Sequence, residues 1–270
     1  MTIAQRNNVH DLGGSGPVLL LAHGFGCNQS MWDDLIPILR SNHRIVTFDY
    51  VGSGGSDVAS FDGQRYSHLE GYAHDVIEVC EAFKLSDITL VGHSVSCSIG
   101  ILASIQRPEL FRRLVFIGPN PCFVNDPPYV GGFERTDLEG LLDLMDQNYF
   151  GWAAYLAPVV SAEPTRGSVT GRLSDSFCST DPVVARIFAR ATFFADNRAD
   201  LPHVSHPCLI LQNKKDNLAP LAVGEYLARE LPHGVLKVLD ISGHCAHMSH
   251  PSLVADAILE FEDGFHHGPR

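Results

Sequence analysis

Three residues of this sequence, Ser94, Asp216 and His244, have side chains that together can carry out nucleophilic hydrolysis. Each closely follows a run of apolar residues that is typical of a buried strand. A serine hydroxyl is a weak nucleophile until an imidazole removes its proton, and a carboxylate orients that imidazole and stabilises the cation that forms. Because parallel strands end at one edge of a sheet, we expect the three side chains to meet at that edge.

The segment Gly92-His93-Ser94-Val95-Ser96 predicts a sharp turn between a strand and a helix. In such a nucleophile elbow the serine hydroxyl stands clear of the sheet and faces the N-terminus of the following helix. Ser96 stands where the last glycine of the pattern Gly-x-Ser-x-Gly usually stands. A pattern this short also arises by chance, so the interpretation depends on the chain order nucleophile, acid, histidine, which the sequence also has.

Hydrolysis also requires donors for the negative charge that builds on the carbonyl oxygen of a substrate. The backbone N–H of Val95, directly after the predicted nucleophile, is one expected donor. The backbone N–H of Phe25 is the other, because it lies in the glycine-rich segment 23–26 at the end of an early strand-like run. Both roles belong to the backbone, so the side chains there say little about the reaction.

Other acidic residues compete with Asp216. Asp49 also ends a strand-like run, but it precedes the elbow and opens a glycine-rich turn, so we interpret it as structural. Asn120 follows the strand after the elbow, where the acid can also lie, and an amide cannot serve as a carboxylate. Asp240 lies too close to His244 in the sequence to orient it from a separate loop. The prediction is therefore Asp216.

A second reading of the histidines is a metal site. His244, His247 and His250 are spaced by three residues, and histidines on one helical face can hold zinc. The turn at Gly243 and the proline at Pro251 make a regular helix through all three unfavourable. His247 is the alternative for the catalytic base, and the position directly after a strand favours His244.

Apolar runs alternate with helix-like segments, which predicts an α/β fold with a mostly parallel central sheet flanked by helices. The expected strands are 9–12, 18–22, 43–50, 88–91, 114–118, 207–212 and 235–241. Helices are expected at 31–39, 66–85, 220–231 and 252–262, with one more after the elbow.

The segment from Pro119 to about residue 205 breaks this alternation. It carries four helix-sized stretches, at 136–147, 149–160, 166–178 and 182–195. Many of its residues are large and apolar, as in a lid over an active site or in a helical subdomain that packs on itself. We expect a core in two parts, 1–118 and 206–270, and a helical lid at 119–205.

Composition limits the classes of partner. The 270 residues carry a formal net charge of −12 and no cluster of Lys and Arg, which argues against nucleic acid and anionic membranes as partners. No apolar run approaches the roughly eighteen residues that cross a bilayer, and residues 1–8 lack a signal-peptide pattern, so we expect a cytoplasmic protein. The seven cysteines are widely spaced and predict reduced thiols. The glycine-rich turn 52–56 lacks Gly-x-Gly-x-x-Gly spacing, so no cofactor is expected.

Six motifs are spread over nearly the whole chain, at residues 23–30, 48–54, 92–96, 107–111, 177–182 and 243–249. Together they resemble the RsbQ-type α/β hydrolases, a group that includes the bacterial sigma-B stress-response regulator and, more distantly, the plant strigolactone and karrikin receptors. The resemblance implies an α/β-hydrolase fold with a four-helix lid, a deep apolar pocket, and slow hydrolysis of a small hydrophobic ester, enol ether or lactone. Ser96 agrees with the plant receptors, whereas the bacterial regulator has glycine at this position.

The resemblance also implies particular site residues and a partner. The implied triad is Ser94, Asp216 and His244, with Phe25 and Val95 as the oxyanion donors. The implied pocket walls are Phe25, Phe123, Trp152, Phe193 and Phe194. A PAS-domain phosphatase or another signalling protein is the implied partner.

The sequence leaves two functions open. The first is a serine hydrolase that acts through an acyl-enzyme on a small hydrophobic ester or butenolide-like lactone, with a signalling role. The second is a ligand-sensing, receptor-like protein in which slow hydrolysis or binding changes the lid and recruits a partner. C–C bond hydrolysis and cofactor-free perhydrolysis use the same triad and also stay open. Haloalkane dehalogenation is disfavoured, because its nucleophile is an aspartate and position 94 is a serine.

Overall fold

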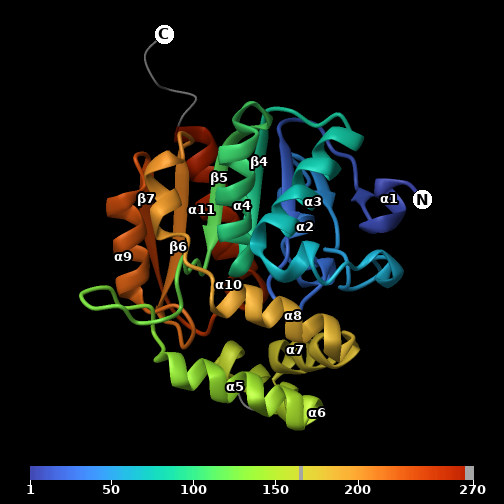
Figure 1. Cartoon of the computed structure of the whole chain (residues 1–270). Helices are drawn as coiled ribbons and strands as arrows, with labels where there is room; N and C mark the ends of the chain where they lie inside the picture. Colours follow the sequence, from blue (N-terminus) through green and yellow to red (C-terminus); the bar gives the residue numbers. More distant parts are fainter. Residues whose placement is uncertain (164–166, 265–270) are drawn as a thin grey trace.

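A seven-stranded sheet forms the centre of the molecule in this computed structural model, which describes residues 1–163 and 167–264 (Figure 1). The strand order is β1-β3-β2-β4-β5-β6-β7, and only the β1–β3 pair is antiparallel in the described chain. The strands are β1 (His10–Asp11), β2 (Val18–Ala22), β3 (Arg44–Thr47), β4 (Ile88–His93), β5 (Phe111–Ile117), β6 (Cys208–Lys215) and β7 (Gly234–Ser242). The predicted α/β fold with a mostly parallel sheet is confirmed.

The central strands send alternate side chains into two hydrophobic cores, one on each face of the sheet. Leu19, Leu21 and Val91 lie in one core, Leu20 and Leu90 lie in the other, and all five are fully buried. Helices α3, α4 and α9 contribute to the second core, whereas α2 and α11 contribute to the first (Figure 1). Because both faces are covered, these strands have continuous apolar sequences rather than alternating ones.

The helices that surround the sheet are of two kinds. The α-helices are α1 (Ile3–Arg6), α2 (Ile36–Leu39), α3 (Leu69–Ala82), α4 (Val95–Gln106), α9 (Leu221–Glu230), α10 (Ala246–Ser249) and α11 (Pro251–Gly264). Short 3-10 helices are η1 (Gln29–Trp32), η2 (Val58–Ser60), η3 (Arg65–Ser67), η4 (Pro108–Leu110) and η5 (Arg198–His203). In the described part of the chain, no helix combines the length and the apolar character that a membrane crossing requires.

Two predicted helices differ from the observed ones. The predicted helix 31–39 is wrong, because the chain forms η1 and then α2 with Pro37 in its first turn. Proline has no N–H and fits the first turn of a helix, so it favours a new start there over a continuous helix. The predicted helix 66–85 is α3, which begins only at Leu69, after η3. The C-terminal residues 265–270, with the predicted frayed tail and its two histidines, lie outside the described residues.

Four α-helices and the 3-10 helix η5 lie between β5 and β6, within the described part of the segment that was predicted to be helical. The α-helices are α5 (Arg135–Gln147), α6 (Tyr149–Ser161), α7 (Ser168–Ser179) and α8 (Pro182–Phe193). Figure 1 shows them together beyond one end of the sheet, apart from the helices on its two faces. Residue 166, the predicted start of the third helix, lies outside the described residues. The division into a core of 1–118 and 206–270 and a lid of 119–205 stays a prediction.

Candidate active site

The turn between β4 and α4 holds Ser94 in a strained backbone conformation. Its φ is 55° and its ψ is −119°, a combination that costs a residue with a side chain on the order of 1–3 kcal/mol. Its N–H donates to Ile117 O on β5 at 2.9 Å. A Cβ at Gly92 would lie 2.7 Å from Ser96 O, so the turn needs glycine there. This segment therefore has the sharp strand-to-helix turn that the sequence predicts.

Asp216 and His244 meet although 28 residues separate them. Asp216 directly follows β6, His244 follows β7 by two residues, and these two strands are neighbours. His244 Nδ1 lies 2.8 Å from Asp216 Oδ2, and both side chains are buried. Asp216 Oδ1 accepts from the N–H groups of Leu218 and Ala219 at 2.8 and 3.1 Å. These bonds hold the carboxylate fixed and assign the proton of the imidazole to Nδ1.

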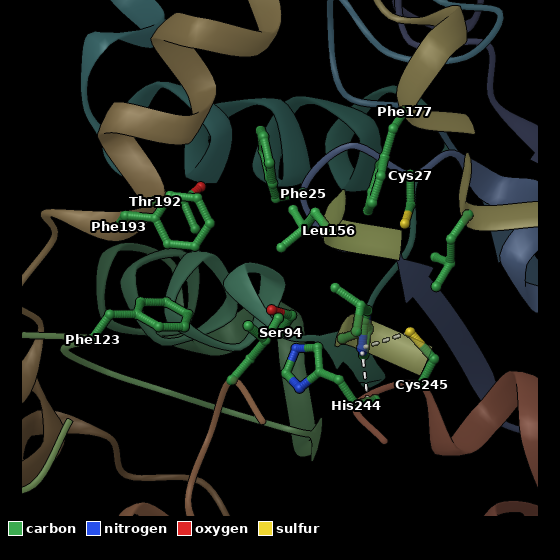
Figure 2. A pocket seen from close by; sticks show the side chains of 14 residues that line it. Phe25, Cys27, Ser94, Phe123, Leu156, Phe177, Thr192, Phe193, His244 and Cys245 are labelled. Carbon is green, nitrogen blue, oxygen red and sulfur yellow. Dashed lines mark hydrogen bonds between the residues drawn. The ribbon is translucent and has the colours of Figure 1, made fainter. Parts of the chain in front are cut away.

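The other ring nitrogen of His244 is free. In the described chain, Nε2 has no hydrogen-bond partner. His244 and Ser94 line the same cavity (Figure 2). Gly118 makes room for the imidazole, because a Cβ there would lie 3.0 Å from two ring atoms. The structure thus brings the three predicted triad residues to one place and leaves a proton acceptor beside the serine.

The segment that carries Phe25 passes against the elbow. A Cβ at Gly24 would lie 3.5 Å from Ser94 Cβ and 2.5 Å from His93 Nδ1, so only glycine allows this approach. Val95 is the first residue of α4, and the N–H groups of a first helical turn have no acceptor within the helix. The segment that carries Phe25 and the first residue of α4 therefore both lie next to Ser94, and the donor roles of their N–H groups stay a prediction.

The competing acids have structural contacts of their own. Asp49 accepts from the N–H groups of Gln29 and Gly55 at 2.8 and 2.9 Å and from Asn8 Nδ2 at 2.7 Å. It thus ties together three segments of the chain. The Asp240 side chain is 82% exposed and pairs with Lys214 at 3.1 Å. Neither carboxylate is a hydrogen-bond partner of His244.

His247, the alternative base, packs against Trp32 and His93 and does not line the cavity of Ser94. Its ring centroid is 4.5 Å from that of Trp32 and 4.5 Å from that of His93. Neither ring nitrogen has a hydrogen-bond partner in the described residues. Burial lowers the pKa of His247 to about 3, so the ring is neutral at pH 7. The described residues contain no group of three His, Cys, Asp or Glu side chains that could hold a metal ion.

The cavity above Ser94 is small and mostly apolar (Figure 2). Its volume is about 30 Å³, measured as the space open to the centre of a water molecule. Its lining residues are Phe25, Cys27, His93, Ser94, Phe123, Leu156, Val160, Leu173, Phe177, Thr192, Phe193, Leu218, His244 and Cys245. Residues before 119 and after 205 line it together with residues between 119 and 205, so the cavity lies between these two groups.

Two of the five predicted pocket walls do not line the cavity. Phe25, Phe123 and Phe193 do, but Trp152 packs behind Phe25, with ring centroids 6.0 Å apart, and is 1% exposed. Phe194 is half-buried, and its ring faces the guanidinium groups of Arg135 and Arg190. Phe193 and Phe194 are adjacent at the end of α8 and point in different directions, which their apolar character alone does not reveal.

Several lining residues had no prediction. Leu156 and Val160 on α6, like Leu173 and Phe177 on α7, are spaced by four residues. Such spacing marks a buried helical face, but it does not tell which buried face meets a cavity. Thr192 on α8 is 3% exposed, and its hydroxyl has no hydrogen-bond partner in the described chain. No sequence signal points to it.

The two cysteines of the cavity are not nucleophiles at neutral pH. Burial raises the pKa of Cys27 to about 12 and that of Cys245 well above its usual value. Thiols react as thiolates, so both side chains act here as small apolar groups. Among the side chains that line the cavity, the hydroxyl groups are those of Ser94 and Thr192.

The chain is similar to proteins of known family. Residues 19–257 match the Alpha/beta hydrolase family, and the chain belongs to that family. A karrikin insensitive 2 receptor of Petunia hybrida is 40% identical over 95% of this chain and 96% of its own length. A strigolactone esterase of Arabidopsis thaliana is 35% identical over 94% and 95%. The predicted resemblance to the group that contains the plant receptors is confirmed.

A solved structure extends the comparison to a bacterial protein. A hydrolase from Oleispira antarctica is 47% identical and superposes with a TM-score of 0.94, covering 97% of this chain and 96% of that one. Most of the described chain therefore has a counterpart of nearly the same shape. The protein is thus an α/β hydrolase similar both to esterases and to receptors.

Proposed function

We propose that the protein hydrolyses a small hydrophobic ester or butenolide-like lactone through an acyl-enzyme on Ser94. The observation that supports this most directly is the Asp216–His244 hydrogen bond of 2.8 Å, together with an unpartnered His244 Nε2 and a cavity that both His244 and Ser94 line. The names of the plant relatives, a receptor and a strigolactone esterase, support the same substrate class.

The steps follow from these positions. His244 Nε2 takes the proton of Ser94 Oγ while Oγ bonds to the carbonyl carbon, and the N–H groups of Phe25 and Val95 receive the oxyanion. Collapse breaks the bond to the leaving alkoxide, which takes the proton from His244. Water then attacks the acyl carbon, His244 takes its proton, and the acyl bond to Oγ breaks as that proton returns to Ser94. In a lactone the alkoxide remains part of the acyl group.

The test is turnover of p-nitrophenyl acetate and butyrate, since a cavity of about 30 Å³ favours short acyl groups. Ser94→Ala is expected to lower kcat by at least on the order of 10³-fold with an unchanged melting temperature. Intact mass after a short exposure should show one acyl group on the wild type and none on Ser94→Ala. Full activity of Ser94→Ala would exclude this proposal.

A second candidate function is ligand sensing, in which the lid of residues 119–205 responds to the site and binds a partner. Two observations support it. His244 N donates to Val160 O on α6 at 2.7 Å, which connects the site directly to the lid. On the same helix, Phe150 and Tyr155 are 66% and 60% exposed and offer apolar surface to another protein. A PAS-domain phosphatase or another signalling protein in the cytoplasm is the partner that we propose.

Limited proteolysis of the lid with and without a lactone tests this candidate. We expect the lactone to alter cleavage within residues 119–205 of the wild type. We also expect the wild type to bind a partner protein and the variants Phe150→Ser and Tyr155→Ser to lose this binding. A cleavage pattern that stays the same at saturating ligand would count against sensing and leave hydrolysis as the output. Fractionation of cells tests the cytoplasmic location.

A further inference from the structure

Ser96, which stands where the elbow pattern has its last glycine, makes two buried hydrogen bonds. It is the second residue of α4 and is 0% exposed. Ser96 Oγ donates to His23 O at 2.5 Å and lies 2.8 Å from the hydroxyl of Tyr50. Because Ser96 has one proton and uses it on a carbonyl, Tyr50 must be the donor in the second bond. The hydroxyl thus joins the elbow helix to the segment that carries Phe25.

The His23 side chain fixes the next peptide of that segment. Its Nε2 accepts from Tyr50 N at 3.2 Å, so the ring proton is on Nδ1, which donates to Gly24 O at 2.9 Å. Burial lowers the pKa of His23, which keeps the ring neutral. Cys27 N also donates to Gly24 O, at 3.2 Å.

These bonds determine where the N–H of Phe25 points. In a trans peptide the carbonyl and the N–H point in opposite directions, so two donors on Gly24 O set the direction of Phe25 N–H. The bond from Ser96 to His23 O fixes the peptide immediately before it. Two successive peptides are thus held, one by the His23 ring and Cys27 and the other by the elbow helix.

We propose that Ser96 is a positioning residue that holds the two oxyanion donors at a fixed separation. Val95, the neighbour of Ser96 in α4, provides one donor, and Phe25, two residues after His23, provides the other. The hydrogen bond from Ser96 to His23 O makes both parts of a single rigid unit. A glycine at position 96 has no side chain to make this link. The inference rests on the proposed hydrolysis at Ser94.

Ser96→Ala removes the link, and Ser98→Ala is the matched control. Ser98 lies on the same helix, is 3% exposed, and bonds through its hydroxyl to the carbonyl of Asn120 instead of the Phe25 segment. Because misplacing an oxyanion donor costs less than deleting it, we expect Ser96→Ala to lower kcat roughly 10- to 100-fold with KM within about twofold. Ser98→Ala should keep the wild-type kcat.

A transition-state analogue separates positioning from general loosening of the fold. Phenylboronic acid forms a tetrahedral adduct with an active-site serine, and its inhibition constant should rise by about the factor by which kcat falls in Ser96→Ala. Tyr50→Phe, which keeps the bond from Ser96 to His23, should lower kcat less than Ser96→Ala. If Ser96→Ala does not fold, Ser96→Gly replaces it, with the same expected result.

Three outcomes would overturn the role of Ser96 while leaving hydrolysis at Ser94 intact. They are an unchanged kcat in the Ser96 variants, a rise in KM alone, and an equal loss of kcat in Ser98→Ala. If the wild type itself has no turnover that depends on Ser94, the proposed function fails first, and the role of Ser96 fails with it.

Discussion

The two walls of the cavity are held together by different forces. The core wall, made of the lining residues before 119 and after 205, is held by hydrogen bonds, from His244 Nδ1 to Asp216 Oδ2 at 2.8 Å and from Ser96 Oγ to His23 O at 2.5 Å. The lid wall, made of the lining residues between 119 and 205, consists mainly of packed aromatic and aliphatic side chains. Its one hydroxyl that lines the cavity belongs to Thr192 and has no hydrogen-bond partner in the described residues. Hydrogen bonds fix directions, whereas apolar packing mainly fixes volume. The core wall is therefore suited to chemistry and the lid wall to the choice of ligand.

The largest expected effect is a loss of activity when the carboxylate of Asp216, which bonds to His244 in the core wall, is replaced. In Asp216→Asn the amide no longer stabilises the imidazolium and can hold the wrong tautomer of His244, so kcat for p-nitrophenyl acetate should fall on the order of 10³- to 10⁴-fold. The matched control is Asp240→Asn, because Asp240 is exposed and bonds to Lys214. If both variants lost activity equally, Asp216 would not be the acid of the triad.

The next largest effect is a loss of stability when Trp152, which packs on the lining residue Phe25, is replaced. Trp152→Ala removes a ring that is 1% exposed and packs on Phe25, so the free energy of unfolding should fall by about 3 kcal/mol in urea titrations. Phe194→Ala, at a half-buried ring, should cost less than about 1 kcal/mol. Equal losses would mean that the two aromatics do not differ in packing as the structure indicates.

Acid should destabilise the folded protein through the buried ring of His247. The pKa of His247 is about 3 in the folded protein and about 6.5 in the unfolded chain, so between these values the unfolded chain binds more protons. Stability is therefore full above pH 6.5 and is lost as the pH falls, by about 2 kcal/mol at pH 5 for this group. Unfolding free energies measured from pH 7 to pH 5 should decline less in His247→Gln.

The control for this pH series is His10→Gln, because the side chain of His10 is exposed. It should keep the wild-type decline. His93 has the same direction of shift, since burial lowers its pKa well below the usual value, so part of the decline should remain in His247→Gln. An unchanged slope in His247→Gln would show that this ring is not the group that resists protonation.

The smallest effect concerns the unpartnered hydroxyl of the lid wall. Thr192→Val keeps the volume of the side chain and removes its hydroxyl. A hydrogen bond from this hydroxyl to a ligand is worth about 1 kcal/mol, which corresponds to roughly fivefold in kcat/KM. The comparison uses p-nitrophenyl methoxyacetate and p-nitrophenyl butyrate, whose acyl chains differ by an ether oxygen in place of a CH₂. The ratio of their kcat/KM values should fall in Thr192→Val and stay near that of the wild type in Thr192→Ser. A ratio that does not change would mean that the lid wall selects by volume alone.

The core wall could largely be predicted from the sequence, and the lid wall could not. Ser94, Asp216 and His244 each follow a strand, and parallel strands must end at the same edge, so local pattern and topology place them together. Trp152 and Phe194 have the same apolar character as Phe193, yet only Phe193 lines the cavity. Which face of a lid helix meets the cavity depends on how four helices pack, and no local pattern contains that information.

The sequence by itself determined the alternating α/β fold, the elbow at Ser94 and the order of nucleophile, acid and histidine, because these follow from apolar runs, small residues and the direction of parallel strands. Only the tertiary structure decided that His244 bonds to Asp216, that Ser96 holds the Phe25 segment, and that a cavity of about 30 Å³ remains above the serine. These features join residues far apart in the chain, and their geometry is set by packing, not by the properties of neighbouring residues.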